Sequence, residues 1–142
     1  MVYFQNSGLG NAVNPLTSLT DRNVYGIPMI ILMGWRGQPG LKDEPQHKKM
    51  GAITIQMLEA LGVSYEILNK NNFKEQIEKA KLFAEKKLEP FVLIVKPNFF
   101  IDALEVEKTA SNDGVTRENA IECIVNKISF DSKILSTAGK TS

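Results

Sequence analysis

The feature that most constrains the fold of this sequence is the alternation of short apolar runs with longer segments of helical period. The apolar runs lie at residues 2–4, 28–33, 63–68 and 91–95. Runs of this length are typical of strands that are buried on both faces of a parallel sheet. Since consecutive parallel strands are joined by right-handed crossovers through helices, the alternation predicts an α/β protein with an open, mostly parallel sheet flanked by helices.

Helical periodicity marks the segments between these strands. Apolar residues recur every three or four positions at Met50, Ile53, Met57 and Leu61, and again at Phe73, Ile77, Ala80 and Ala84. These patterns predict two helices with buried apolar faces. Gly62 suits the C-terminal end of the first helix, and Asn72 with Glu75 resembles a capping box at the start of the second. Residues 9–19 are also predicted to be helical, with a kink or a later start at Pro15.

The pattern changes after Pro97. Residues 99–114 include acidic and polar residues and contain an Asn112-Asp113-Gly114 turn, which indicates a linker. Thr116 is a suitable N-cap for a further helix. The apolar face of this helix is formed by Ala120, Ile121, Ile124, Val125 and Ile128. The apolar residues at 134–135 are compatible with one more strand.

The charge balance excludes several classes of partner. The 142 residues carry a formal net charge of +1, which leaves no basic surface of the size that nucleic acid or an anionic membrane requires. No segment approaches the roughly 18 apolar residues of a transmembrane helix, and the N-terminus lacks a signal-peptide pattern. The single cysteine, Cys123, can form no internal disulfide. We therefore expect a cytoplasmic protein whose partners are small molecules or protein.

Two loops are expected to meet at one edge of the predicted sheet, because ligands of open parallel sheets bind outside the carboxyl ends of the strands. The first, residues 6–10, is a glycine loop directly behind the apolar run 2–4. Its glycines would allow a ligand to approach the backbone closely, although a tight strand-to-helix turn has the same pattern. The second, residues 34–47, is rich in glycine, proline and polar residues and contains the only tryptophan and the only histidine. Loops of this length between regular elements usually bind a ligand or cover a binding site.

Arg36, Lys42 and His47 are the candidate anion-binding residues of the second loop. A guanidinium binds an oxyanion bidentately, and a histidine exchanges a proton near neutral pH. The alternative is a solvated surface loop. A nucleotide-binding module is disfavoured because the glycine loop lacks the third glycine of a dinucleotide fingerprint. In addition, the ending at 139–141 (Gly-Lys-Thr) lacks a phosphate-loop glycine at position 134.

Three motifs resemble those of one enzyme family. They are Gln-Asn-Ser-Gly-Leu-Gly-Asn-Ala at 5–12, Gly-Trp-Arg-Gly at 34–37 and Lys-Asp-Glu-Pro-Gln-His at 42–47. These motifs are similar to those of the phosphonopyruvate decarboxylases, thiamine-diphosphate enzymes close to the sulfopyruvate decarboxylases. The resemblance extends over nearly the whole chain, with the motifs in the order of the family.

The resemblance also implies a partial chain. Residues 1–98 resemble the later part of a pyrimidine-binding domain, 99–114 a linker, and 115–142 the start of a diphosphate-binding domain. The family's catalytic glutamate would lie upstream of the glycine loop, and its Gly-Asp-Gly and Asn magnesium site downstream. Neither has a counterpart here. Asn112-Asp113-Gly114 is not counted as the magnesium motif, because it lies in the linker with no predicted strand before it. We therefore expect the isolated chain to be inactive, and to be completed in a homo-oligomer or by other chain segments.

The activity that the resemblance implies is decarboxylation of a small 2-oxo acid, 3-phosphonopyruvate, to phosphonoacetaldehyde and CO₂ in phosphonate biosynthesis. The cofactors would be thiamine diphosphate and Mg²⁺, with the metal ligands outside this chain. Five residues would bind the pyrimidine end of the cofactor: Ser7, Gly8, Leu9, Gly10 and Asn11. Gln46 and His47 would lie near the reacting carbons, and Arg36 and Lys42 near the phosphonate. Two alternatives stay open, a sulfopyruvate decarboxylase subunit and a catalytically silent fragment.

Overall fold

The fold is built on a five-stranded parallel sheet, in a computed structural model that describes residues 1–100, 116–129, 131 and 135–136. The strands are β1 (Val2–Gln5), β2 (Met29–Gly34), β3 (Ser64–Ile67), β4 (Pro90–Val95) and β5 (Leu135–Ser136). Their order in the sheet is β3-β4-β2-β1-β5, and every neighbouring pair is parallel. The predicted fold class is confirmed, as are the four strands predicted from the apolar runs.

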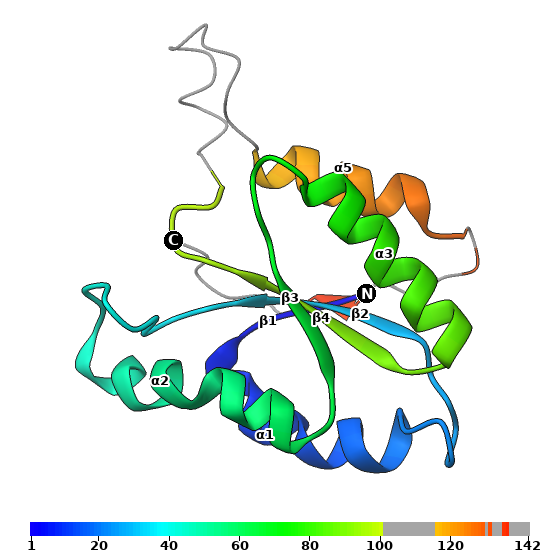
Figure 1. The fold of residues 1–142 in the computed structure, drawn as a ribbon, viewed down its shortest axis with the longest axis horizontal. Helices are drawn as coiled ribbons and strands as arrows, with labels where there is room; N and C mark the ends of the chain where they lie inside the picture. The colour runs from blue at the N-terminus through cyan, green and yellow to red at the C-terminus, as the bar shows by residue number, and fades with distance from the viewer. Residues whose placement is uncertain (101–115, 130, 132–134, 137–142) are drawn as a thin grey trace, which may run out of the picture.

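Helices cover both faces of this sheet (Figure 1). One face carries α1 (Leu9–Asn14) and α2 (Pro45–Ala60), and the other carries α3 (Phe73–Lys87) and α5 (Arg117–Lys127). Successive residues of β2 point to opposite faces, so Met33 packs in the core under α1 and α2, and Leu32 in the core under α3 and α5. Within the described part of the chain, no helix is both long enough and apolar enough to cross a membrane.

The chain behind β1 is helical from Asn6 onward. A short 3₁₀ turn, η1 (Asn6–Gly8), leads into α1, and a π-helical segment, η2 (Pro15–Leu19), follows α1. Pro15 has no N–H to donate to the preceding turn, so the regular α-helical pattern ends there. The predicted interruption at Pro15 is confirmed.

Helix α3 is present as predicted, but the predicted cap is wrong. The residues of its apolar repeat are all buried: Phe73, Ile77, Ala80 and Ala84. The Asn72 side chain makes no capping hydrogen bond. Instead Gln76 joins the helix to the preceding loop, with its Oε1 accepting from the backbone N–H of Asn69 (2.8 Å) and its Nε2 donating to the carbonyl of Ile67 (2.9 Å). A side chain inside the first turn therefore fixes the start of α3 against the end of β3.

Helix α2 begins earlier than the sequence predicts, and its most deeply buried residues lie beside the predicted apolar stripe. It starts at Pro45, which suits a first helical position, so Gln46 and His47 lie in its first turn and not in the loop. The buried residues are offset from the predicted stripe: Gly51, Thr54 and Leu58. The predicted stripe, from Met50 to Leu61, is only partly buried. The reason is that the N-terminal half of α2 packs against the backbone of the preceding loop, where small residues fit.

Helix α5 is capped as predicted. The Thr116 Oγ1 accepts a hydrogen bond from the backbone N–H of Asn119 (2.9 Å), and the Asn119 side chain accepts one in return from Thr116. Only part of the predicted apolar face is buried, since Ala120 and Ile124 pack in the core whereas Ile121 is 38% exposed. A helix lying on a sheet buries a narrow stripe, and Ile121 lies on the flank of that stripe.

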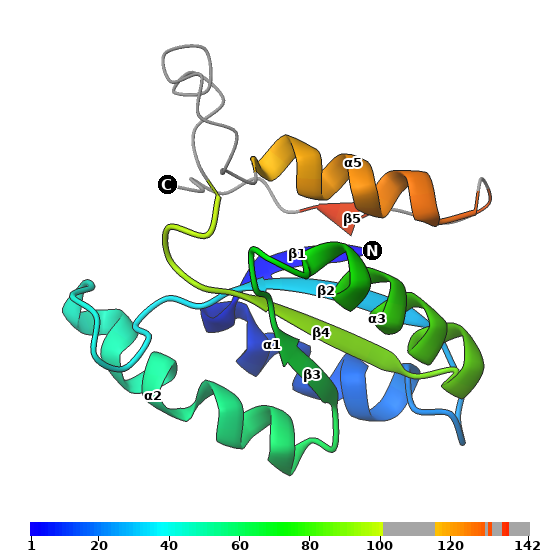
Figure 2. The ribbon, with the colours of Figure 1, turned by 45° about the horizontal axis from the view of Figure 1, so that its top comes forward.

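Strand β5 adds to the sheet beside β1 (Figure 2). Leu135 pairs with Val2, and Ile124 of α5 packs in the same core as Leu32. The described residues after 115 therefore lie on the same sheet as residues 1–98, and a domain boundary between them stays a prediction. Most of the predicted linker, including Asn112-Asp113-Gly114, lies outside the described residues, as does the ending at 139–141.

Candidate active site

The two predicted loops meet at the carboxyl edge of the sheet through the side chain of Asn6. This side chain is 0% exposed. Its Nδ2 donates to the backbone carbonyl of Arg36 (2.8 Å), and its Oδ1 accepts from the backbone N–H of Arg36 (3.0 Å). Nδ2 also donates to the Thr54 Oγ1 of α2 (2.8 Å). One buried amide thus joins the glycine loop, the second loop and α2.

The second loop is closed by an ion pair between Arg36 and Asp43. The Nε and Nη2 atoms of Arg36 donate to the two carboxylate oxygens, at 3.0 Å and 2.7 Å. Asp43 also accepts from the backbone N–H of Gly37 (2.6 Å) and of Glu44 (2.8 Å). The hydrogen bond from Arg36, followed by that from Gly37, holds the pKa of Asp43 well below its usual range, and the same pair raises the pKa of Arg36. Two guanidinium nitrogens of Arg36 are therefore engaged inside the loop.

A tight turn forms the tip of this loop. The backbone N–H of Leu41 donates to the carbonyl of Gln38 (3.1 Å), with Pro39 and Gly40 between them. Gly40 has φ +85°, which matches the third position of a type II turn and favours glycine there. Lys42 follows the turn and is exposed. The turn thus presents the Lys42 ammonium group at the end of the loop.

The loop lies directly on the first turns of α2. The backbone of Gly37 has φ +66°, and a Cβ atom on it would stand 2.0 Å from the carbonyl oxygen of His47. The indole Nε1 of the buried Trp35 donates to the carbonyl of Gly51 (2.9 Å). His47 is half-buried at this contact and Gln46 beside it is exposed. Both predicted catalytic residues therefore lie at the junction of the loop and α2.

The glycine loop has a buried side and an open side. The side chain of Leu9 is 0% exposed and packs in the core, so only its backbone can face a ligand. Gly8 is half-buried, and a Cβ atom on it would stand 3.2 Å from the ring of Phe4. Ser7, Gly10 and Asn11 are exposed, and a Cβ atom on Gly10 would meet nothing within 4 Å.

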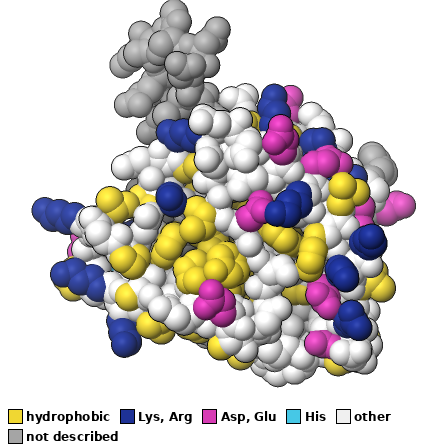
Figure 3. Space-filling model, viewed as in Figure 1, with side chains coloured by type: hydrophobic (Ala, Val, Ile, Leu, Met, Phe, Trp, Pro, Cys, Tyr) yellow, Lys and Arg dark blue, Asp and Glu magenta, His cyan; other side chains and the backbone are white. Residues whose placement is uncertain are grey.

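The structure adds one cation that the sequence analysis did not select. Lys96 directly follows β4 and is exposed. The backbone N–H of Trp35 donates to the carbonyl of Val95 (2.8 Å), so the backbone of Lys96 lies next to the start of the second loop. The signal was present in the sequence, because the residue behind the apolar run 91–95 must lie at the carboxyl edge. Figure 3 shows Lys and Arg side chains projecting at the end of the molecule where the loop before α2 lies.

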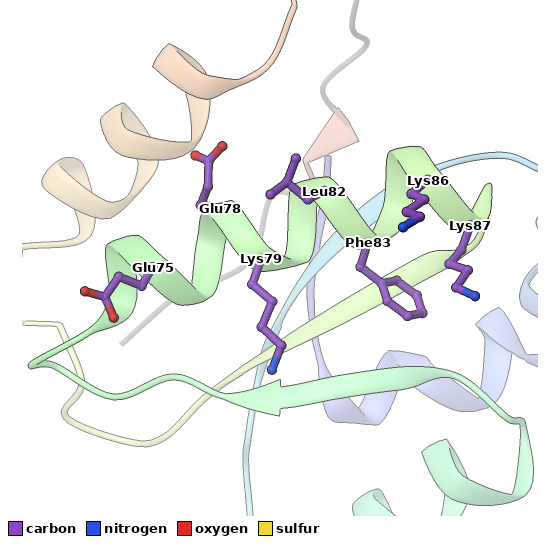
Figure 4. Close-up of a pocket in the computed structure, with 7 residues that line it drawn as sticks. All are labelled: Glu75, Glu78, Lys79, Leu82, Phe83, Lys86 and Lys87. Carbon is purple, nitrogen blue, oxygen red and sulfur yellow. The ribbon is translucent and has the colours of Figure 1, made fainter.

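A hollow of about 510 Å³ lies elsewhere, along the outer side of α3 (Figure 4). Its lining comes from this helix alone: Glu75, Glu78, Lys79, Leu82, Phe83, Lys86 and Lys87. Two of its charged groups are already paired, Lys79 with Glu66 and Glu78 with Lys127. Among the residues that the structure describes, no three His, Cys, Asp or Glu side chains are grouped so that they could hold a metal ion.

The fold defines an α/β domain with loops at the carboxyl edge of a parallel sheet, which is the edge where ligands of such sheets bind. These loops carry Lys42 and Lys96, and His47 lies directly behind one of them in α2. No protein-family model matches the chain. The chain is 30% identical to the phosphonopyruvate decarboxylase of Streptomyces hygroscopicus over 97% of its residues, and 48% identical to that of Streptomyces viridochromogenes over 45%. It is 33% identical to the sulfopyruvate decarboxylase of Methanosarcina acetivorans over 68% of its residues.

These similarities place the chain in the family of phosphonopyruvate and sulfopyruvate decarboxylases. The matched regions cover only part of each relative. They span 38% of the Streptomyces hygroscopicus protein, 16% of the Streptomyces viridochromogenes protein and 24% of the Methanosarcina acetivorans protein. The chain therefore corresponds to one part of a longer relative.

Proposed function

We propose that this chain supplies part of the active site of a decarboxylase that converts 3-phosphonopyruvate to phosphonoacetaldehyde and CO₂ with thiamine diphosphate and Mg²⁺. The observation that carries the proposal is the junction at Asn6, which joins the glycine loop to the loop that carries the candidate substrate residues. The similarity to two phosphonopyruvate decarboxylases supports the substrate class.

The candidate substrate residues differ in whether their side chains are already bonded within the protein. Lys42 is exposed at the loop tip and would attract the phosphonate, with Lys96 as a second cation at the same edge. Arg36 shares Nε and Nη2 with Asp43, so its remaining nitrogen, Nη1, is the atom that would reach a phosphonate oxygen. His47 would hold or move a proton beside the reacting carbons, and the exposed Gln46 would hydrogen-bond to the carboxylate or keto group.

The glycine loop fits the pyrimidine end of thiamine diphosphate. Its exposed residues are Ser7, Gly10 and Asn11, and the missing side chain of Gly10 leaves open space on that side. A ring could therefore approach the backbone there, and Leu9 would contribute through its backbone only. When bound, the cofactor would take up the electrons of the bond to the departing CO₂. The ligands of Mg²⁺ would come from outside this chain.

Activity would require more than these residues. Since the chain corresponds to 38% of the Streptomyces hygroscopicus relative, we propose that the isolated chain is inactive and that other chain segments or a second copy complete the site in the cytoplasm. The protein would bind a small 2-oxo acid as its substrate, and it would bind neither nucleic acid nor a membrane.

A second candidate substrate is sulfopyruvate. The chain is 33% identical to a sulfopyruvate decarboxylase over 68% of its residues, and a sulfonate is also a compact anion beside a keto acid. The phosphonate carries a second negative charge near neutral pH, which favours a site with more than one cation, such as Lys42 and Lys96. Substrate competition separates the two.

The experiment is an assay of aldehyde release by the complete protein, from phosphonopyruvate and from sulfopyruvate, with and without thiamine diphosphate and Mg²⁺. The expected result is activity that needs both cofactors and is faster on phosphonopyruvate. Faster aldehyde release from sulfopyruvate would make sulfopyruvate the preferred substrate in place of phosphonopyruvate. No release from either acid would contradict the proposed function, and the isolated 142-residue chain serves as the matched preparation that we expect to be inactive.

A further inference from the structure

We propose that Asn6 is a positioning residue, which holds the glycine loop in register with the second loop and sets the direction in which His47 points. This inference rests on the proposed function for the identity of the ligands. Asn6 itself is fully buried, so it touches neither substrate nor cofactor. It would act through the backbone of Arg36 and through the side chain of Thr54.

The first step is the way in which Asn6 continues the sheet. The backbone ladder between β1 and β2 ends at the pair Gln5 and Gly34. Beyond this pair the chain turns into η1 and no longer offers a strand to Arg36. The side-chain amide of Asn6 takes the place of a strand backbone as the hydrogen-bond partner of Arg36. Its Oδ1 accepts from the N–H of Arg36, and its Nδ2 donates to the carbonyl of the same residue. The two loops are thereby held together one step past the end of the strands.

The second step is the contact with α2. Thr54 lies seven residues after His47, which is close to two helical turns, so the two side chains lie on the same face of α2. Gly51 lies between them on this face and contacts the loop. The Thr54 hydroxyl accepts from Asn6 and donates to the carbonyl of Met50 (2.7 Å), which fixes its orientation. The hydrogen bond at Thr54 therefore opposes rotation of α2 about its axis, and in our proposal it holds His47 in place along with the helix.

The third step is that Asn6 has no hydrogen-bonding group to spare. Both Nδ2 hydrogens are donated, to Arg36 and to Thr54, and Oδ1 accepts from Arg36. A buried amide with every group bonded tolerates little change, because any replacement leaves a buried partner unpaired. Asn6→Asp keeps the acceptor but removes both donors, and it turns a carboxylate oxygen toward the carbonyl of Arg36.

The test uses the complete protein and two readouts. The first is backbone hydrogen exchange, measured without any ligand. Asn6→Ala should speed exchange of the Arg36 amide at least tenfold and raise exchange across 45–51, while the α3 amides at 73–87 keep their rates. Thr54→Val removes the hydroxyl and should raise exchange across 45–51, and Thr54→Ser restores the hydroxyl and should restore slow exchange. Asn14→Ala, an exposed asparagine on the same segment, is the matched control.

The second readout is kinetic. Asn6→Ala and Thr54→Val should raise both the KM for phosphonopyruvate and the concentration of thiamine diphosphate at half-saturation at least fivefold, with Thr54→Ser and Asn14→Ala within twofold of wild type. A purely structural role would lower the folded fraction and leave both constants unchanged, which would overturn the proposal. A uniform rise of exchange over the whole chain would overturn it too. If the wild-type protein decarboxylates neither acid, the proposed function fails, and the exchange pattern alone still decides whether Asn6 couples the loops.

Discussion

Gly51 of α2 lies so close to Gly37 of the second loop that a Cβ atom on Gly51 would stand 1.8 Å from the carbonyl oxygen of Gly37. The obstacle is backbone, so it cannot move aside as a flexible side chain can. Gly51→Ala should therefore lower the free energy of unfolding by about 3 kcal/mol, more than alanine gains as a better helix former. Urea denaturation measures this change, and wild-type stability in the variant would mean that the loop does not rest on α2.

Gly10→Ala is the matched glycine substitution. A Cβ atom at Gly10 meets nothing within 4 Å, and the residue lies inside α1, so stability should stay equal or rise by about 0.5 kcal/mol. If the open side of the glycine loop holds the cofactor, the same variant should bind thiamine diphosphate more weakly in the complete protein. Isothermal titration with thiamine diphosphate and Mg²⁺ checks this expectation. Unchanged affinity would remove Gly10 from the cofactor site.

Asp43→Asn should destabilise the protein through the second loop. The carboxylate accepts from Arg36, Gly37 and Glu44, and an amide cannot replace the charged bonds, so the expected loss is about 2 kcal/mol at pH 7. Glu44→Gln is the control, since it removes a neighbouring exposed carboxylate. Denaturation midpoints of both variants against wild type provide the measurement. Equal losses in the two variants would argue against a specific Arg36–Asp43 clamp.

The stability that Asp43 contributes should depend on pH in one direction. Its pKa in the folded protein lies below the usual value of about 3.9, so the folded state favours the charged carboxylate. The contribution is therefore complete above about pH 5 and is lost progressively as the pH falls toward the lower pKa of the folded state. The stability difference between wild type and Asp43→Asn should shrink between pH 5 and about pH 2. A difference that grows on acidification would contradict the paired carboxylate.

Lys42→Ala and Lys96→Ala should weaken substrate binding without unfolding the protein. Both side chains are exposed, so neither loss should change the melting temperature. Each should raise the KM for phosphonopyruvate about tenfold, as expected for losing one charge-assisted hydrogen bond of about 1.4 kcal/mol. Lys49→Ala, an exposed lysine farther along α2, should leave KM unchanged. A tenfold effect at Lys49 as well would indicate general charge attraction instead of a site.

The strands and α3 were predictable because the side chains on each buried face are packed in the core along the whole length of the element. The apolar run at Phe91–Val95 forms a strand with β-sheet neighbours on both sides and helices on both faces, so every residue is buried and the sequence pattern is continuous. Helix α3 packs on the sheet along its length, so its apolar period matches its buried face. The motif-bearing loops were predictable in position for the same reason, since a parallel sheet collects its strand ends at one edge.

The internal structure of the site was not predictable from period or composition. Helix α2 packs on loop backbone at its N-terminal half, so it buries Gly51 and Thr54 most deeply. The predicted apolar residues Met50, Met57 and Leu61 lie beside them and are only partly buried against the core. The clamp between Arg36 and Asp43 joins two motifs, and nothing in the sequence says which charged residues pair across a loop. A short polar side chain such as Asn6 carries no signal of burial, because asparagine is usually exposed.

The position of β1 has a consequence for the order in which the chain folds. β1 lies between β2 and β5, and its two neighbours come from near opposite ends of the described chain. Contacts of such long sequence separation form late, because the entropy of closing a long loop must be overcome first. During synthesis, the strand that carries the glycine loop would have one neighbour until β5 leaves the ribosome. Both edges of β1 would thus be paired only after residues 135–136 have been made.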